Sequence, residues 1–282
     1  MRWRAEVVLD HREWNPGGGS AVVCVHGIAQ RGAVFGEMAE QLAGDGRRVV
    51  AVDLRGHGSS SAEPPWTIAA HVADLVESAE ALGLESATWV GHSFGARLCA
   101  ELAAGFPRSV SALALLEPAF DVPAARARQA ALIEAMDWSF ETVEGAANAV
   151  LAAETSRGAD ADAVTAYVRE DVSLDGRGRY RFSHSGEAVA GSWEAMTGPD
   201  PEIAERPTLL LRAAQSHLDW SRTEDRYREA LGPLLSSATV PGGHNVFWSA
   251  PQATTSTVAQ FLAEADSAPV STLPQTSQGG LK

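Results

Sequence analysis

Short runs of consecutive apolar residues recur along the first part of the chain, and longer stretches with helical spacing separate them. The runs are too short for helices and suit strands that are buried on both faces, as in a parallel sheet. Strands are predicted at residues 21–25, 48–52, 87–90 and 111–116, with helices at 34–43, 67–82 and 94–104. Polar and apolar residues alternate over residues 2–9, which predicts a half-buried strand. Strands that alternate with helices in this way predict βαβ units and a mostly parallel sheet.

The alternation stops in the middle of the chain and resumes near its end. Residues 120–205 are rich in alanine and predict helices, followed by a polar loop. The helices are expected at 122–136, 140–154 and 161–170, and the loop at 171–187. After this stretch, strands are expected at 208–213 and 238–240, and helices at 223–231 and 251–264.

This interruption predicts a helical cap that is inserted into one α/β core. The core would occupy residues 1–119 and 206–266, and the cap or lid would occupy residues 120–205. The alternative is that the helices of this stretch extend the core instead of covering it. Residues 267–282 are rich in Ser, Pro, Gln and Gly and are expected to form a disordered tail.

Composition and charge narrow the choice of partners. With 282 residues, of which 45% are hydrophobic and 21% charged, the chain has an ordinary globular composition. The net charge of -14 argues against nucleic acids and anionic membranes as partners. The N-terminus lacks the apolar region of a signal peptide, and no apolar stretch reaches the roughly 18 residues of a membrane span. We therefore expect a cytoplasmic protein, and a homodimer is compatible with the sequence.

The segment Gly91-His-Ser93-Phe-Gly95 lies between a predicted strand and a predicted helix. A strand that turns sharply into a helix strains its middle residue, and glycines on both sides remove the clashes that such a turn would cause. The hydroxyl of Ser93 would then stand above the sheet, with the positive end of the helix dipole behind it. This context predicts that Ser93 is a nucleophile. The alternative is an incidental serine in a glycine-rich turn.

Four motifs extend this pattern over most of the chain. They are VVCVHG, DLRGHGSS, VGHSFG and PGGHNVF, each at the end of a predicted strand, and they span residues 21 to about 264. With these motifs the chain resembles the α/β-hydrolase superfamily, in the branch of compact esterases, lactonases and C–C hydrolases with a helical cap. The resemblance implies the α/β-hydrolase fold, which is a mostly parallel central sheet flanked by helices, with the cap inserted.

The resemblance also implies roles for one histidine and two backbone amides. His244, in the motif GGHN, would be the general base, since a neutral imidazole can take the proton of Ser93 near pH 7. Without the resemblance, His244 could be a histidine of a surface loop. The oxyanion hole would be formed by the amide of Phe94, which follows the nucleophile, and the amide of Ile28, which follows the motif HG.

The acid that would orient His244 is open between two residues. Most relatives carry an aspartate in the loop after the strand at 208–213, but this chain has Ser216 there, with Asp219 shortly after it. Glu117 ends the strand that follows the nucleophile helix, where some relatives carry their acid. A carboxylate at that strand tip would point into the same site. We therefore favour Glu117 and keep Asp219 as the alternative.

Together these residues predict a serine hydrolase that cleaves a small apolar carboxylic ester or lactone through an acyl-enzyme. The sequence shows no metal-ligand cluster and no dinucleotide fingerprint, so we expect neither a metal nor a cofactor. The alternatives are a C–C hydrolase of diketone-like ring-cleavage products and a non-catalytic binding protein on the same fold. Aromatic residues of the expected cap would either contact an apolar substrate or form the core of the cap itself. They are Phe120, Trp138, Phe140, Tyr167 and Trp193.

Overall fold

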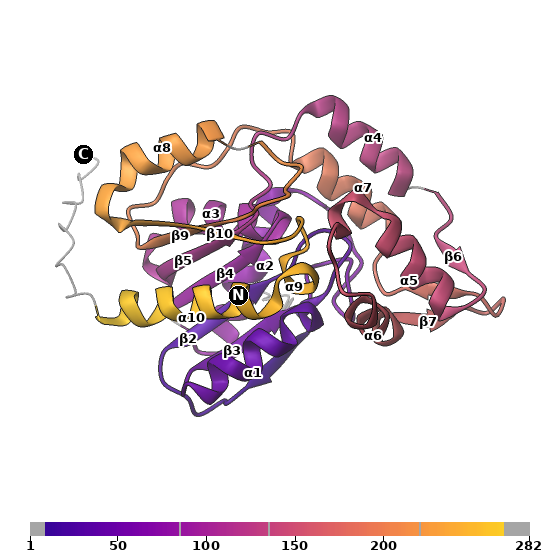
Figure 1. Ribbon diagram of the computed structural model, residues 1–282, viewed down its shortest axis with the longest axis horizontal. Helices are drawn as coiled ribbons and strands as arrows, with labels where there is room; N and C mark the ends of the chain where they lie inside the picture. Colours follow the sequence, from indigo (N-terminus) through magenta and orange to yellow (C-terminus); the bar gives the residue numbers. More distant parts are fainter. Residues whose placement is uncertain (1–8, 85, 135, 220, 268–282) are drawn as a thin grey trace, which may run out of the picture.

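The protein is built on a seven-stranded sheet with the strand order β1-β3-β2-β4-β5-β9-β10 (Figure 1). A computed structural model describes residues 9–84, 86–134, 136–219 and 221–267. The strands are β1 (His11–Trp14), β2 (Ala21–Val25), β3 (Arg48–Val52), β4 (Ala87–His92), β5 (Val110–Leu116), β9 (Thr208–Ala213) and β10 (Leu235–Val240). Within this sheet β1 pairs antiparallel with β3, and all other pairs are parallel. The mostly parallel sheet that the sequence predicts is confirmed.

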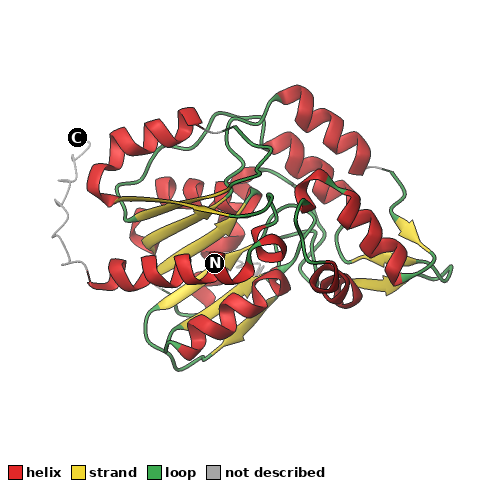
Figure 2. Ribbon diagram, in the orientation of Figure 1, coloured by secondary structure: helices red, strands yellow, loops and turns green. Residues whose placement is uncertain are grey.

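Helices cover both faces of the sheet, and each face has its own hydrophobic core (Figure 2). The helices are α1 (Gly36–Gly44), α2 (Ile68–Ala81), α3 (Phe94–Gly105), α8 (Ser221–Leu231), α9 (Val246–Ser249) and α10 (Pro251–Ser267). On one face Val23 and Val25 of β2 pack with α2 and α3, and on the other face Val22 and Cys24 pack with α1 and α10. Successive side chains of a strand point to opposite faces, so a strand covered on both faces is apolar along its whole length.

The predictions for the two ends of the chain fall almost entirely outside the described residues. The strand predicted at 2–9 lies outside the described residues apart from Leu9, and the first strand among the described residues is β1. The tail predicted at 267–282 also lies outside them, apart from Ser267, which ends α10. Among the described residues, none of the helices combines the length and the hydropathy that crossing a bilayer requires.

Residues 120–205 lie between β5 and β9, and we call them the inserted segment. Four α-helices and a small antiparallel sheet of this segment lie together beyond one end of the main sheet (Figure 1). They are α4 (Ala124–Glu134), β6 (Ser139–Phe140), α5 (Val143–Ala152), α6 (Ala161–Asp171), β7 (Val172–Leu174), β8 (Tyr180–Phe182) and α7 (Gly186–Ala195). The three helices that the sequence predicts here are therefore present, and α7 is an additional one.

The prediction of a polar loop at 171–187 is wrong, because this stretch contains β7, β8 and the start of α7. The turn between the two strands is built by Asp175. Its carboxylate accepts hydrogen bonds from the amides of Arg177 and Arg179 at 2.8 and 3.0 Å. The same carboxylate pairs with Arg181 at 2.9 Å. Since polar side chains make this hairpin, the stretch lacks the apolar alternation by which a strand is found in a sequence.

The inserted segment contacts loops that follow the carboxyl ends of the core strands. The amide of Ser185 donates to the carbonyl of Gly56, after β3, at 2.7 Å. The amide of Asn245, after β10, donates to the carbonyl of Thr155 at 3.0 Å. These contacts place the segment at the edge of the sheet where open α/β sheets bind their ligands. A role of the segment as a lid stays a prediction.

Candidate active site

Ser93 lies in a tight turn between β4 and α3. Its backbone has φ 53° and ψ -115°, a conformation that costs free energy in a residue other than glycine. A Cβ atom at Gly91 would lie 2.5 Å from Cα of Ala96. One at Gly95 would lie 2.1 Å from the carbonyl oxygen of Val25. The turn therefore requires glycine at positions 91 and 95. Ser93 itself keeps 9% of its surface exposed.

Three side chains from distant parts of the sequence form a hydrogen-bonded row. Oγ of Ser93 donates to Nε2 of His244 across 2.9 Å. Nδ1 of His244 donates to Oε2 of Glu117 across 3.1 Å. Ser93 follows β4, Glu117 follows β5 and His244 follows β10, so the carboxyl ends of three parallel strands bring them together. A hydroxyl, an imidazole and a carboxylate in this order can activate a serine for attack.

Glu117 is fully buried at the tip of β5, and its φ of 49° lies in the left-handed region. Its carboxylate accepts two further hydrogen bonds, from the amide of Ala213 at 2.7 Å and from the hydroxyl of Ser216 at 2.5 Å. Burial raises the pKa of Glu117, and these two hydrogen bonds oppose that shift. Of Glu117 and Asp219, which the sequence leaves open, the structure brings Glu117 to Nδ1 of His244.

The loop after β2 passes directly beside Ser93. A Cβ atom added to Gly27 would lie 3.2 Å from Cβ of Ser93. The amide of Gly27 donates to Oε1 of Gln30 at 3.1 Å, and the amide of Ala29 donates to a histidine ring nitrogen at 3.2 Å. Ile28, the residue between these two amides, is therefore held in a fixed loop next to Ser93.

Phe94 brings a second amide to the same place. It is the first residue of α3, and amides in the first turn of a helix have no acceptor within the helix. The positive end of the helix dipole adds to the attraction for negative charge. The amides of Ile28 and Phe94 thus lie on two segments that meet at Ser93. An oxyanion hole requires such an arrangement of donors.

Comparisons with known proteins agree on one family. The sequence model of a family described as "alpha/beta hydrolase fold" matches residues 20–251. Over 218 residues the chain is 31% identical to the lipase LipV of Mycobacterium tuberculosis, which corresponds to 74% of this chain and 81% of LipV. The chain belongs to the α/β-hydrolase family.

Solved structures of other α/β-hydrolases superpose on this one. E-2-(acetamidomethylene)succinate hydrolase matches with a TM-score of 0.73 and 25% identity, over 90% of this chain and 99% of that one. The enol-lactonase of Burkholderia xenovorans LB400 matches with a TM-score of 0.73 and 20% identity, over 90% of this chain and 96% of that one. The protein is a hydrolase of the α/β type.

The electrostatic environment of this α/β-hydrolase keeps the imidazole of His244 neutral. Burial lowers the pKa of His244 to about 4, and the positive charge of Arg126 contributes to the shift. At pH 7 the ring can therefore accept the proton of Ser93. Arg126 lies on α4 of the inserted segment. Nothing in the sequence of this alanine-rich helix singles out Arg126, so only the fold reveals its connection with the site.

Two further histidines hold the loops around the site. Nε2 of His26 accepts from the amide of Leu54 at 2.9 Å, and Nε2 of His57 accepts from the amide of Ala29 at 3.2 Å. Burial lowers the pKa of both rings, so they stay neutral and Nε2 remains an acceptor. In the described part of the chain, no group of three or more His, Cys, Asp or Glu side chains is placed to hold a metal ion.

Two polar residues of the site carry no functional signal in the sequence. The resemblance to the family leads us to expect an acid at Ser216, so the sequence suggests that this position has lost its function. In the structure the hydroxyl of Ser216 donates a hydrogen bond to Glu117. Gln30 follows the motif HG and is 6% exposed, with its side-chain amide between Gly27 and Asn245. Buried polar groups need hydrogen-bond partners, and these partners become visible only when the chain is folded.

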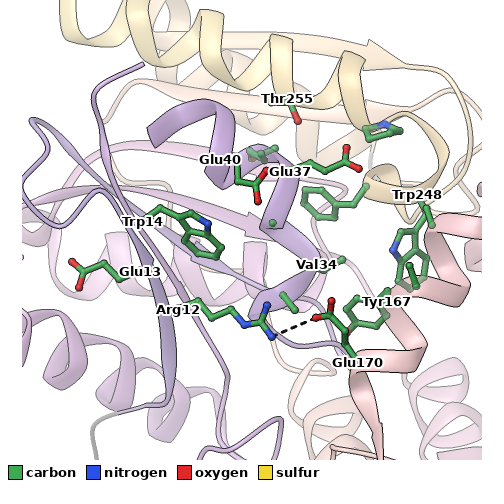
Figure 3. A pocket seen from close by; sticks show the side chains of 17 residues that line it. Arg12, Glu13, Trp14, Val34, Glu37, Glu40, Tyr167, Glu170, Trp248 and Thr255 are labelled. Atoms are coloured by element: carbon green, nitrogen blue, oxygen red, sulfur yellow. Dashed lines mark ion pairs between the residues drawn. The ribbon is translucent and has the colours of Figure 1, made fainter. Parts of the chain in front are cut away.

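A separate cavity of about 580 Å³ lies between β1, α1 and α6 (Figure 3). Trp14, Tyr167 and Trp248 line it, and an ion pair of Arg12 with Glu170 at 3.5 Å lies along one side. The rings of Tyr167 and Trp248 pack against each other, with centroids 5.2 Å apart. None of the three side chains of the hydrogen-bonded row lines this cavity.

Most of the aromatic side chains expected in the cap pack with other aromatic residues. Phe140 lies edge-on to Phe182 with ring centroids 5.8 Å apart, and Trp138 lies 6.3 Å from Phe140. Phe120 stacks on Tyr227 of α8 at 6.0 Å. These contacts favour the alternative in which the aromatic residues form the core of the inserted segment and its junction with the main domain.

Proposed function

We propose that the protein is a serine hydrolase that cleaves a small carboxylic ester or lactone through an acyl-enzyme. The observation that carries the proposal is the hydrogen-bonded row from Ser93 through His244 to Glu117, with distances of 2.9 and 3.1 Å. Such rows activate serine on unrelated folds, because the base takes the proton as the oxygen attacks. The similarity to LipV, which is named a lipase, and to an enol-lactonase in fold supports an ester or a lactone as substrate.

Each residue of the site has one task in this reaction. Oγ of Ser93 attacks the carbonyl carbon while its proton passes to Nε2 of His244, and Glu117 stabilises the resulting imidazolium. The amides of Ile28 and Phe94 stabilise the oxyanion. When the C–O bond breaks, His244 gives its proton to the leaving alcohol and the acyl group stays on Ser93. Water then loses a proton to His244 and attacks the acyl carbon. His244 returns this proton to Oγ of Ser93 as the acyl–oxygen bond breaks, which releases the acid and restores free Ser93.

The enclosure of the site supports a small apolar substrate. Ser93 and His244 keep only 9% and 7% of their surfaces exposed. Ile28 and Leu218, from the loops on either side, are partly buried and pack against the hydrophobic core. Apolar walls with a few convergent polar groups are typical of small-molecule sites. We therefore propose a short acyl chain or a small lactone ring.

The first test removes the nucleophile. Ser93→Ala is expected to abolish hydrolysis of p-nitrophenyl acetate and butyrate, and a fluorophosphonate probe is expected to label Ser93 of the wild type. Ser86→Ala makes the same change at an exposed position and should keep wild-type turnover. Turnover at the wild-type level in Ser93→Ala would show that the proposal is wrong.

A second measurement separates bond types. The same residues could act on a carbon–carbon bond, so the substrate panel should include esters, lactones and vinylogous diketones of aromatic ring cleavage. We expect the highest kcat/KM for an ester or lactone. A higher kcat/KM for a diketone would replace the proposed substrate class and leave the role of Ser93 unchanged.

A further inference from the structure

The side chain of Gln30 lies buried between three segments that come together at Ser93. Its Oε1 accepts from the amide of Gly27 at 3.1 Å, and its Nε2 donates to Oδ1 of Asn245 at 3.1 Å. Gly27 directly precedes Ile28, and Asn245 directly follows His244. Gln30 is 6% exposed and Asn245 is 8% exposed, so these hydrogen bonds are shielded from water.

The ring of His92 closes this arrangement. Nδ1 of His92 lies 3.1 Å from Oε1 of Gln30, and Nε2 of His92 lies 2.9 Å from the carbonyl oxygen of His244. The neutral ring carries one N–H and donates to one of these two oxygens. His92 directly precedes Ser93, so its ring places the segment of the nucleophile against Gln30 and the loop of the base. Gln30 therefore contacts the oxyanion loop, the nucleophile turn and the base loop with one side-chain amide.

We propose that Gln30 is a positioning residue that sets the distance between the oxyanion donor at Ile28 and the base His244. This inference rests on the proposed function of Ser93 and His244. The two loops are far apart in the sequence, and Gln30 and Asn245 are separated by 215 positions. A glutamine suits this place because its oxygen can accept from Gly27 while its nitrogen donates to Asn245. Errors of about 1 Å in such geometry can lower rates about 100-fold.

The network also reaches the inserted segment. The amide of Asn245 donates to the carbonyl of Thr155 at 3.0 Å, and Nδ2 of Asn245 lies 3.5 Å from Oγ of Ser156. Asn245 therefore contacts both the inserted segment and Gln30.

The test uses Gln30→Met, which keeps a similar size and removes the hydrogen bonds. We expect kcat for p-nitrophenyl butyrate to fall about 10- to 100-fold while KM changes less than about threefold, since alignment matters in the transition state. Gln41→Met is the matched control on the exposed side of α1 and should leave both constants unchanged. Folded Gln30→Met with kcat within twofold of the wild type would overturn the proposal.

Gln30→Glu gives a second readout that a purely structural role would not move. The carboxylate keeps the acceptor for Gly27 and adds a negative charge close to His92 and His244. A nearby negative charge favours the imidazolium, so the acid limb of the kcat/KM profile should move to higher pH. An unchanged acid limb in folded Gln30→Glu would contradict the proposal, and this variant remains informative if Gln30→Met does not fold.

Hydrogen exchange distinguishes a failure of this inference from a failure of the proposed function. Without Gln30 the amide of Gly27 loses its acceptor, so exchange of the amides of residues 27–29 should become faster in Gln30→Met. This readout does not need an active enzyme. Unchanged exchange would overturn the role of Gln30 even if Ser93 is the nucleophile. Faster exchange, in a protein whose Ser93 neither reacts with fluorophosphonate nor supports turnover, would refute only the proposed function.

Discussion

The hydroxyl of Ser216 donates to Oε2 of Glu117 at 2.5 Å, and Nδ1 of His244 donates to the same oxygen. Ser216 lies in the loop after β9, where the resemblance to the family leads us to expect an acid. The carboxylate therefore comes from the tip of β5, and the loop after β9 contributes a hydroxyl that binds it. The strands β5 and β9 pair in register up to Leu116 and Leu211, so an acid at either tip reaches the same region.

This arrangement leads to a prediction about the acid. Glu117→Gln should lower kcat about 1000-fold, because a neutral amide cannot stabilise the imidazolium of His244. The double variant Glu117→Ala with Ser216→Asp should recover part of this loss, since it returns a carboxylate to the usual loop. Hydrolysis of p-nitrophenyl butyrate measures both effects.

The control for this experiment is Asp219→Asn, which we expect to change kcat little. A strong loss in Asp219→Asn, together with normal activity in Glu117→Gln, would mean that Asp219 is the acid. A double variant without any recovery would show that the carboxylate must come from β5.

The charge of Arg126 gives a prediction about pH. Arg126 contributes to the lowering of the His244 pKa to about 4, so removing its charge should raise that pKa. The base must be neutral to act, and activity is lost as the pH falls through its pKa. Arg126→Gln should therefore move the acid limb of kcat/KM to higher pH and leave the rate at pH 7 unchanged.

Arg128→Gln is the matched control, because Arg128 is exposed on the same helix as Arg126. Profiles of kcat/KM between pH 4 and 7 distinguish the two variants, provided that each protein is shown to be folded at every pH. Equal profiles for both variants would show that Arg126 does not act on His244.

The close approach of the oxyanion loop gives a prediction about Gly27. A Cβ atom there would lie 2.9 Å from Nδ1 of His92 and 3.2 Å from Cβ of Ser93. Gly27→Ala should displace the loop and lower kcat about 100-fold. Gly36→Ala is the control, because a Cβ atom at Gly36 meets nothing within 4 Å and its φ of -47° is helical. If Gly27→Ala keeps full activity, the loop can shift without loss of alignment.

The sequence predicts those parts of the fold and site that depend on local patterns. The strands at 21–25, 48–52 and 208–213 have the predicted bounds, because apolar runs buried on both faces give a clear signal. Ser93 and His244 are found from motifs at strand ends. The hairpin of β7 and β8 is not predicted, because its turn depends on Asp175 and arginine side chains.

Other features depend on contacts between distant segments, which a sequence does not contain. Glu117 and Asp219 stay open as alternatives because the sequence does not show which strand tip lies beside His244. The folded loops decide this, because Oε2 of Glu117 lies 3.1 Å from Nδ1 of His244 although β9 stands between β5 and β10. Gln30 has no local signal either, since its partner Asn245 lies 215 positions away. The same holds for Arg126, whose charge acts on a loop at the other end of the chain.

The buried histidines predict how stability depends on pH. Burial lowers the pKa of seven histidines. At pH 5 to 6 a larger fraction of these rings is therefore neutral in the folded protein than in the unfolded chain. They are His26, His57, His71, His92, His184, His217 and His244. Unfolded histidine has a pKa of about 6.5, so the unfolded chain takes up protons first as the pH falls. The contribution of these histidines to stability is complete above pH 6.5 and is lost as the pH falls below it, by up to about 1.4 kcal/mol per pH unit for each fully buried ring.

Three carboxyl groups, two of them buried and that of Glu134 half-buried, act in the opposite direction, because burial raises the pKa values of Glu117, Glu134 and Asp171. The folded protein holds these protons more strongly, which offsets part of the loss at acid pH. The histidines outnumber them, so we expect the urea midpoint to fall markedly between pH 7 and pH 5. His71→Leu removes one histidine, whose pKa in the folded protein is about 3. The decrease of the urea midpoint between pH 7 and pH 5 should therefore be smaller in this variant, by the contribution of one proton. Equal midpoints for the wild type at pH 7 and pH 5 would show that the folded protein does not hold these rings neutral.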